Sequence, residues 1–312
     1  LMTTIATSGL ISTHSRGWLA RAWTRNGAGY MFLLPWFIGF FGLTAGPALV
    51  SLYLSFTSFD LLTAPRWVGL DNYVRIATAD PKFMASMRVT FFFVLVSVPL
   101  KLIFALAVAM ALNRGIRGLP WYRAIFYLPS LLGASVAISV LWRQLFSGDG
   151  LVNSFLANFG VEGPSWISNP NYSIYTLIVL AVWQFGSPMI IFLAGLRQIP
   201  QDMYEAAELD GASKWRQFWK ITLPLLTPVV FFNAVVQTIE AFKAFTPAFI
   251  ISGGTGGPIN STLFYTLYLY QEAFGFFRMG YASALAWVLL VIIALFTAFS
   301  FLTARYWVHY DD

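Results

Sequence analysis

The sequence contains no cysteine, only two histidines and few charged residues. Charged side chains make up 10% of its 312 residues, whereas a typical soluble domain carries roughly 25%. The lack of cysteine excludes disulfides and thiolate metal sites. His14 and His309 stand near opposite ends of the chain, outside any metal-ligand spacing of the His-Glu-x-x-His kind. We therefore predict no catalytic residues and no metal site in this chain.

Apolar residues, by contrast, make up 58% of the sequence, which is more than a compact soluble core could hide. Six stretches each hold the roughly 20 apolar residues that a bilayer requires. These predicted spans cover residues 28–56, 89–112, 124–146, 173–196, 221–251 and 282–306. The first contains several prolines and glycines and is expected to bend, and the fifth is expected to bend near Pro247. A polar segment with strand-like and helix-like pieces is expected at 57–88.

This pattern predicts an all-α integral membrane protein with six transmembrane helices. We place a cytoplasmic N-terminal segment at 1–27, the six-span domain at 28–306 and a cytoplasmic tail at 307–312. Six spans put both chain ends on the same side of the membrane. The side on which they lie follows from the distribution of Lys and Arg.

Lys and Arg are unevenly divided between the two sides. One side carries eleven of the nineteen: Arg16, Arg21, Arg25, Arg114, Arg117, Arg123, Arg197, Lys214, Arg216, Lys220 and Arg305. The other carries six: Arg66, Arg75, Lys82, Arg88, Arg143 and Arg278. Lys101 and Lys243 fall inside spans. Cytoplasmic loops are enriched in Lys and Arg, so the richer side is predicted to be cytoplasmic. The net charge of +6 then suits a lipid surface, and no nucleic-acid partner is expected.

The longest polar interruption in the second half of the chain is 201–224. It holds four acids followed by three bases: Asp202, Glu205, Glu208, Asp210, Lys214, Arg216 and Lys220. The pattern predicts two short helices joined at Gly211, where a missing side chain permits a sharp turn. Asp202 is expected to cap the first helix with Glu205 as its reciprocal partner. From spacing alone, the stretch is an ordinary amphipathic loop helix.

The residues of this stretch resemble the EAA loop of ABC importer permeases. The resemblance rests on Glu205-Ala206-Ala207, then Gly211, then Ile221-Thr222-Leu223-Pro224. Further stretches resemble the carbohydrate-uptake branch of that family: 47–56, 68–73, 113–118, 122–129, 256–258 with 261–262, and 281–284. The resemblance therefore covers the whole chain.

The resemblance implies a type I ABC importer permease fold with cytoplasmic coupling helices, in the cytoplasmic (inner) membrane of a bacterium. The implied ATPase-coupling residues are Glu205, Ala206, Ala207, Asp210 and Gly211. The implied partners are two ATPase subunits, a second related permease and an external solute-binding protein. ATP and Mg would bind to the ATPases, and this chain would hold no cofactor. The implied function is inward transport of a sugar or oligosaccharide by alternating access.

Polar residues gather in the fifth span, where they are costly and usually face protein or water. Asn233, Gln237, Glu240 and Ala244 recur at helical spacing and share one face, and Lys243 follows Glu240 at i+3. Two interpretations remain open: a wet wall that contacts a polar solute, or interhelical hydrogen bonding with Glu240 and Lys243 neutralising each other. The resemblance favours solute contact. It adds three further candidates for the substrate site: Trp183, Gln184 and Ser130. Lys101 receives no role.

A glycine-rich run at 253–258 lacks the Gly-Lys-Ser/Thr of a phosphate-binding loop and falls on the predicted outer side. We expect an irregular turn there, near the exit of the solute path. Two other functions compete with ATP-driven import as explanations of this sequence. An ion-coupled secondary transporter would use Glu240 and Lys243 as its coupling pair. A membrane-embedded enzyme is disfavoured because no catalytic constellation is present.

Overall fold

The structure is a computed structural model that describes residues 31–115, 118–133 and 135–309. The predicted segment 1–27 and the arginines within it lie outside these residues. The described chain is helical apart from a two-stranded sheet. Among the described residues, 31–53 and those from 54 onward belong to separate compact units, and each is considered by itself.

The first span is one helix, Met31–Ser55, long and apolar enough to cross a membrane. Its middle, η1 (Phe40–Ala45), is a π-helix, and α2 (Gly46–Ser55) follows. A Cβ at Gly46 would lie 2.7 Å from the carbonyl oxygen of Phe41, so the wider turn needs a glycine at its exit. The irregularity expected from the prolines and glycines therefore takes the form of a π segment.

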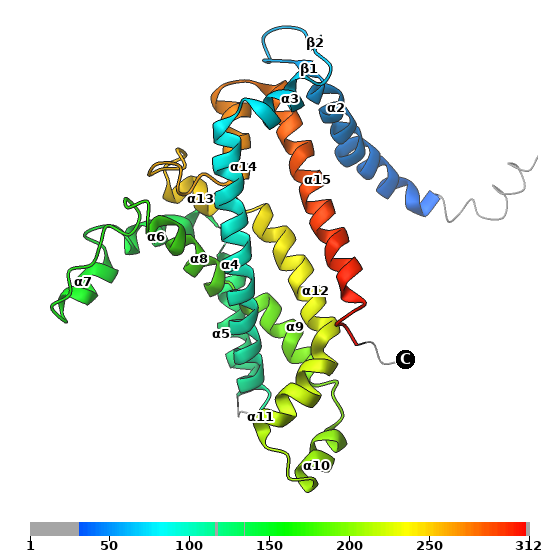
Figure 1. The fold of residues 1–312 in the computed structure, drawn as a ribbon, viewed down its shortest axis with the longest axis vertical. Helices are drawn as coiled ribbons and strands as arrows, with labels where there is room; N and C mark the ends of the chain where they lie inside the picture. Colours follow the sequence, from blue (N-terminus) through cyan, green and yellow to red (C-terminus); the bar gives the residue numbers. More distant parts are fainter. Residues whose placement is uncertain (1–30, 116–117, 134, 310–312) are drawn as a thin grey trace, which may run out of the picture. The chain divides into compact units, whose positions relative to one another are not determined.

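The remaining elements belong to residues 54–312 (Figure 1). They are β1 (Thr57–Ser58), β2 (Arg66–Trp67), α3 (Asp71–Thr78), α4 (Pro81–Leu112), α5 (Leu119–Leu132), α6 (Val136–Leu145), α7 (Leu151–Ala157), α8 (Ser173–Trp183), α9 (Gly186–Leu196), α10 (Gln201–Leu209), α11 (Lys214–Gln217), η2 (Phe218–Thr222), α12 (Leu223–Phe242), α13 (Thr246–Ile251), α14 (Tyr265–Tyr270), η3 (Gln271–Gly275) and α15 (Met279–Ala304). The strands pair antiparallel, with Thr57 opposite Trp67. Figure 1 shows α10 and α11 at one end of this unit and α3, β1 and β2 at the other.

By length and composition, four helices in the described residues can cross a membrane, or up to six if each bent pair counts as one span. The bent pairs are α5 with α6, which differ by 94°, and α8 with α9, which differ by 42°. The predicted third span over 124–146 is therefore a bent pair rather than one straight helix, because the helix ends at Leu132 and restarts at Val136. The fifth span breaks between Phe242 and Thr246, next to the expected position at Pro247.

The second span begins at Pro81 rather than at residue 89, which corrects the predicted polar segment 57–88. The start is set by Asp80, whose Oδ1 accepts the backbone N–H groups of Lys82 and Phe83 at 3.0 Å each. Pro81 has no N–H to satisfy and stands at the first helical position, where proline is favoured. Arg88 consequently lies in α4. The sixth span also begins earlier than predicted, at Met279.

Helix α4 is the central element of the packing, since it contacts α8, α9, α12 and α14. The N-terminal half of α4, including Phe93 and Val98, packs in an apolar cluster with residues of α8, α14 and α15. The C-terminal half of α4, including Ala105 and Ala109, packs in a second apolar cluster with residues of α9 and α12. Small residues allow the close approach that helices in a membrane need. At Gly186, a Cβ would meet the carbonyl oxygen of Phe126 at 2.5 Å.

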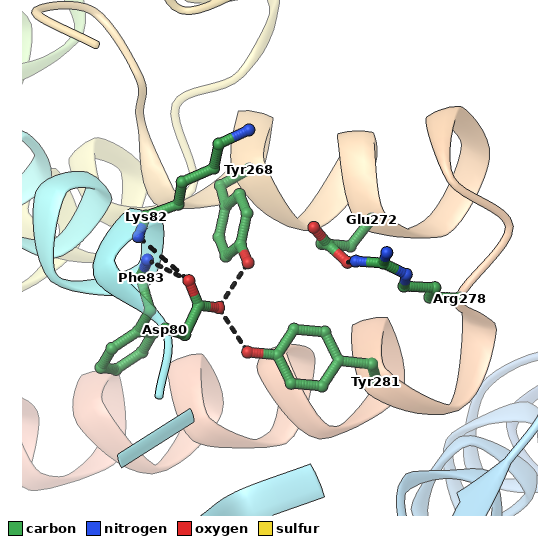
Figure 2. Close-up of polar contacts among 7 residues, drawn as sticks. All are labelled: Asp80, Lys82, Phe83, Tyr268, Glu272, Arg278 and Tyr281. Atoms are coloured by element: carbon green, nitrogen blue, oxygen red, sulfur yellow. Dashed lines mark hydrogen bonds and ion pairs between the residues drawn. The ribbon is translucent and has the colours of Figure 1, made fainter. Parts of the chain in front are cut away.

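A buried polar cluster joins three helices at the end of the unit opposite α10. Figure 2 shows Asp80 between Tyr268 of α14 and Tyr281 of α15, whose hydroxyls both donate to its Oδ2. Burial by itself raises the pKa of Asp80, but the hydrogen bonds from the two tyrosines and from the backbone outweigh it, so its pKa lies below the ordinary value. The carboxylate thus remains ionised and ties α4, α14 and α15 together.

Candidate functional site

A cavity of about 240 Å³ opens between α4, α8 and α12. It lies beside the first apolar cluster, whose residues Phe93, Val98, Leu177, Leu180 and Phe264 form part of its wall. Seven polar side chains line it: Ser97, Lys101, Gln184, Gln237, Glu240, Lys243 and Thr246. The apolar part of the wall includes three phenylalanines: Phe93, Phe245 and Phe264. Hydrogen-bonding groups beside aromatic surface suit a polyhydroxylated solute, which has hydroxyls to pair and C–H faces to cover.

Two helix interruptions border this cavity. Gln184, between α8 and α9, and Lys243 to Phe245, between α12 and α13, are both part of its wall. Non-helical backbone at membrane depth is tolerated where it lines a cavity and its polar groups are satisfied. Ser130 supplies that satisfaction at the first break, where its Oγ donates to the Gln184 carbonyl and accepts the Ser187 N–H, at 3.0 Å each. At the second break, the Thr266 hydroxyl donates to the Ala244 carbonyl.

The charges of the cavity do not cancel. Lys243 Nζ lies 2.8 Å from Glu240 Oε1, which is the i, i+3 pairing described by one of the two interpretations left open for this span. Lys101 takes part in none of the three ion pairs found among the described residues. Two lysines and one glutamate leave the wall with one net positive charge. Across residues 31–115, 118–133 and 135–309, no group of three acids or histidines could hold a metal ion.

The structure brings together five of the eight residues predicted for the substrate site. Gln184, Gln237, Glu240, Lys243 and Ala244 all line the cavity. Gln237 is 8% exposed, and its amide makes no hydrogen bond within the described part of the chain. It therefore remains available to a solute in the cavity.

The other three predicted residues lie elsewhere. Asn233 is fully buried one helical turn below Gln237, and neither of its amide atoms finds a partner in the described chain. Trp183 packs beside Trp142, with ring centroids 6.0 Å apart. Ser130 supports the backbone at the α8–α9 break, as described above. None of the three is part of the cavity wall.

Sequence reasoning passed over Lys101 and Ser97, which the structure places in the wall. A lysine in the middle of an apolar span was a usable signal, because charged residues there usually face a protein interior or water. What the sequence could not show was which neighbouring helices α4 turns this residue toward.

The α10–α11 segment forms an elbow, as predicted, with its turn at Gly211. The Gly211 N–H donates to the Glu208 carbonyl at 3.0 Å, and the Ala212 N–H donates to the Ala207 carbonyl at 2.9 Å. These two bonds form a Schellman motif, which requires a left-handed residue after the helix. Gly211 has a φ of 74°, a conformation that side chains disfavour.

Further bonds fix the elbow. The Ser213 hydroxyl caps α11 by accepting the Arg216 N–H at 3.3 Å. The hydroxyls of Tyr204 and Thr222 lie 2.9 Å apart and connect α10 to the start of the fifth span. Lys214 pairs with Glu208 across the turn, and its hydrogen bond and charge lower the pKa of the Glu208 carboxyl. The segment is therefore a built structure rather than a loose loop.

The predicted cap by Asp202 is wrong. Helix α10 follows Pro200 and has no side-chain cap. Asp202 lies inside the first turn, where its charge faces the positive end of the helix dipole without capping it.

The solvent-facing side of α10 is mostly exposed within this chain. Glu205, Ala206 and Asp210 are exposed, and Ala207 is half-buried. Leu209 at the end of α10 is 91% exposed. An exposed apolar tip flanked by acids is suited to a partner surface.

The glycine-rich run at 253–258 is an irregular turn, as predicted. Gly253, Gly254 and Gly256 all have positive φ values. The Gln271 amide donates to the Gly254 carbonyl at 2.7 Å and ties the turn to η3.

The known proteins similar to this chain are membrane components of transport systems. The family described as "Binding-protein-dependent transport system inner membrane component" matches residues 76–308. The probable ABC transporter permease protein YesP of Bacillus subtilis (strain 168) is 54% identical over 288 residues, which cover 92% of this chain and 93% of YesP. The lactose transport system permease protein LacF of Rhizobium radiobacter is 33% identical over 301 residues, covering 95% and 99%.

A solved structure is similar over nearly the whole chain. It is the crystal structure of a bacterial ABC transporter involved in the import of the acidic polysaccharide alginate. The match has a TM-score of 0.79 and covers 92% of this chain and 98% of that one. With 22% sequence identity, the likeness bears on the fold.

Proposed function

The chain belongs to the family of binding-protein-dependent transport system inner membrane components and has the type I ABC importer permease fold, and on that basis we propose that it carries a sugar or oligosaccharide inward by alternating access. It is a multi-pass membrane protein and a transport subunit, not an enzyme. The observation that carries the proposal is the cavity bordered by the two helix breaks. Its wall combines amide, hydroxyl and aromatic groups at membrane depth.

The solute belongs to a class that its relatives handle. LacF is named for lactose, a neutral sugar, and the similar solved transporter for alginate, an acidic polysaccharide. The proposed contacts in this chain are Gln184, Gln237, Glu240, Lys243 and Ala244. At about 240 Å³, the cavity is below the roughly 300–1,000 Å³ of typical ligand sites. A second, related permease would complete the site.

Energy would enter through the elbow. Glu205, Ala206, Ala207 and Asp210 would contact a cleft on a cytoplasmic ATPase, with Leu209 as the apolar tip and Gly211 as the turn. The Tyr204–Thr222 contact would transmit movement of α10 to the fifth span, since the two hydroxyls lie 2.9 Å apart. ATP and Mg would bind to the two ATPase subunits, and this chain would bind neither of them.

We place the elbow and both chain termini on the cytoplasmic side, where the excess of Lys and Arg also lies. The glycine-rich turn and the Asp80 cluster then face outward, toward the solute-binding protein. Ion-coupled secondary transport receives no support from the relatives, of which YesP is named a probable ABC transporter permease and LacF a transport system permease.

The test is reconstitution of this chain with its second permease and two ATPases in proteoliposomes, with the binding protein outside. Radiolabelled sugar is expected to accumulate only with ATP and Mg. Accumulation by this chain alone under a proton gradient would overturn the proposal.

A further inference from the structure

We propose that the cavity selects an anionic sugar, one bearing a carboxylate or a sulfonate, and that Lys101 is the residue that recognises its charge. The inference rests on the proposed function and specifies its substrate class. The family does not decide this point, because neutral and acidic saccharides both occur among the relatives.

The position of Lys101 is the first step. It lies midway along α4, between Val98 of one apolar cluster and Ala105 of the other, and it lines the cavity. A cation at this depth needs an anionic partner or water, because transfer out of water is costly. A lysine in such a place therefore faces the cavity for a reason other than packing.

The second step concerns the anion that is already present. Glu240 is the one acid in the cavity wall, and its carboxylate is engaged by Lys243 at 2.8 Å. Lys101 makes no ion pair among the described residues. Glu240 also attracts Lys101 electrostatically, so two lysines share one carboxylate and the wall keeps one net positive charge for a ligand. An ammonium acts as a point charge and accepts a carboxylate or a sulfonate without a fixed angle.

The third step is the neighbouring chemistry. Gln184, Gln237 and Ser97 offer hydrogen bonds to hydroxyls, and Phe93 and Phe245 offer apolar surface to the ring. A small inorganic anion would pair with the charge of Lys101 and leave these groups without a partner. An acidic sugar would pair with the charge through its acid group and with the neighbouring groups through its hydroxyls and ring.

The experiment measures the affinity of the assembled importer in lipid nanodiscs, without binding protein, by calorimetry. The probes are cellobiouronic acid and cellobiose, which differ only in a carboxylate in place of a hydroxymethyl group. Since hydrogen bonds to charged groups are stronger than neutral ones, the acid is expected to bind about tenfold more tightly or better. Lys101→Met should abolish that preference, whereas Lys101→Arg should retain it.

Arg88→Gln is the matched control, because Arg88 is an exposed cation of the same helix that does not line the cavity; its preference should equal that of the wild type. Equal binding of both sugars by the wild type, or an unchanged preference in Lys101→Met, would overturn the inference. So would failure of both sugars to bind an importer that still performs ATP-driven uptake. The comparison of the two sugars on the wild-type importer does not depend on any variant folding. Absence of ATP-driven uptake by the wild type would count against the proposed function instead.

Discussion

The hydroxyl of Tyr281 donates a hydrogen bond to the carboxylate of Asp80, although 201 positions separate the two residues. The contact joins the first turn of the last span to the residue that caps the second (Figure 2). Tyr268 donates to the same oxygen. Because these hydrogen bonds to Asp80 lie where three helices converge, their loss should lower the stability of the whole helix bundle.

Asp80→Asn is expected to destabilise the protein by about 2 kcal/mol, since an amide nitrogen replaces the oxygen to which both tyrosines donate. The capping bonds to Oδ1 can survive. Asp60→Asn is the matched control, because Asp60 also accepts backbone N–H groups, from Leu62 and Thr63, but in an exposed turn. Thermal unfolding in detergent should show a lower midpoint for the first variant and little change for the second. Equal midpoints would contradict the role given to Asp80.

The same cluster predicts a pH dependence. The pKa of Asp80 in the folded protein lies below its ordinary value, so its contribution is fully present above the ordinary pKa, about 4. The contribution is lost as pH falls through the folded value. The difference in midpoint between wild type and Asp80→Asn should therefore be constant from pH 7 to pH 5 and shrink below about pH 4. A difference that grew on acidification would be inconsistent with this assignment.

Gly211→Val should impair coupling at the elbow. A Cβ at Gly211 would have open space around it, so the penalty lies in the backbone, where the positive φ costs a side chain about 1–2 kcal/mol. This would reduce the ordered elbow population relative to the disordered one by a factor of about 5–30. Transport per ATP hydrolysed is expected to fall accordingly in proteoliposomes. Gly211→Asn, which tolerates this conformation, should retain coupling; identical behaviour of both variants would refute the explanation.

Gln237→Ala and Asn233→Leu should have different effects, although both remove an amide from the same face of α12. Loss of a hydrogen bond to the solute should reduce uptake at limiting concentration by about 2–10-fold in Gln237→Ala. Asn233 is buried and unpaired, and an unsatisfied buried amide costs about 1–3 kcal/mol. Asn233→Leu should therefore keep its uptake and unfold at a higher temperature. A transport defect confined to Asn233→Leu would reverse these assignments.

The apolar stretches predicted the spans because the length of a bilayer-crossing helix is set by the membrane. The elbow was equally predictable, since Gly211 and the charges around it act locally. The start of α4 was predictable in principle, because Asp80 followed by Pro81 is a helix-start signal.

The breaks and the cavity were harder to predict. Pro188 follows the α8–α9 break, but the bonds that permit the break come from Ser130, on a different helix. Periodicity placed Asn233 and Gln237 on one face, and it could not show that the face meets protein at Asn233 and a cavity at Gln237. Lys101 was visible in the sequence, and its importance depends on tertiary neighbours.

The absence of native cysteine allows a single introduced thiol to report on sidedness. Leu209→Cys, on the elbow, and Ile259→Cys, in the glycine-rich turn region, replace residues that are 91% and 86% exposed. In intact cells, a membrane-impermeant maleimide should label only Ile259→Cys. Labelling of both variants is expected after permeabilisation, and labelling of Leu209→Cys in intact cells would invert the proposed topology.

The most direct test of the account is cross-linking from the tip of the elbow. In the assembled importer, Leu209→Cys carrying a short photoactivatable maleimide should form its adduct with an ATPase subunit, and the adduct should depend on nucleotide state. Ile259→Cys should form no such adduct. If Leu209→Cys instead cross-linked only to lipid or to the binding protein, the elbow would have no ATPase partner and the account would be contradicted.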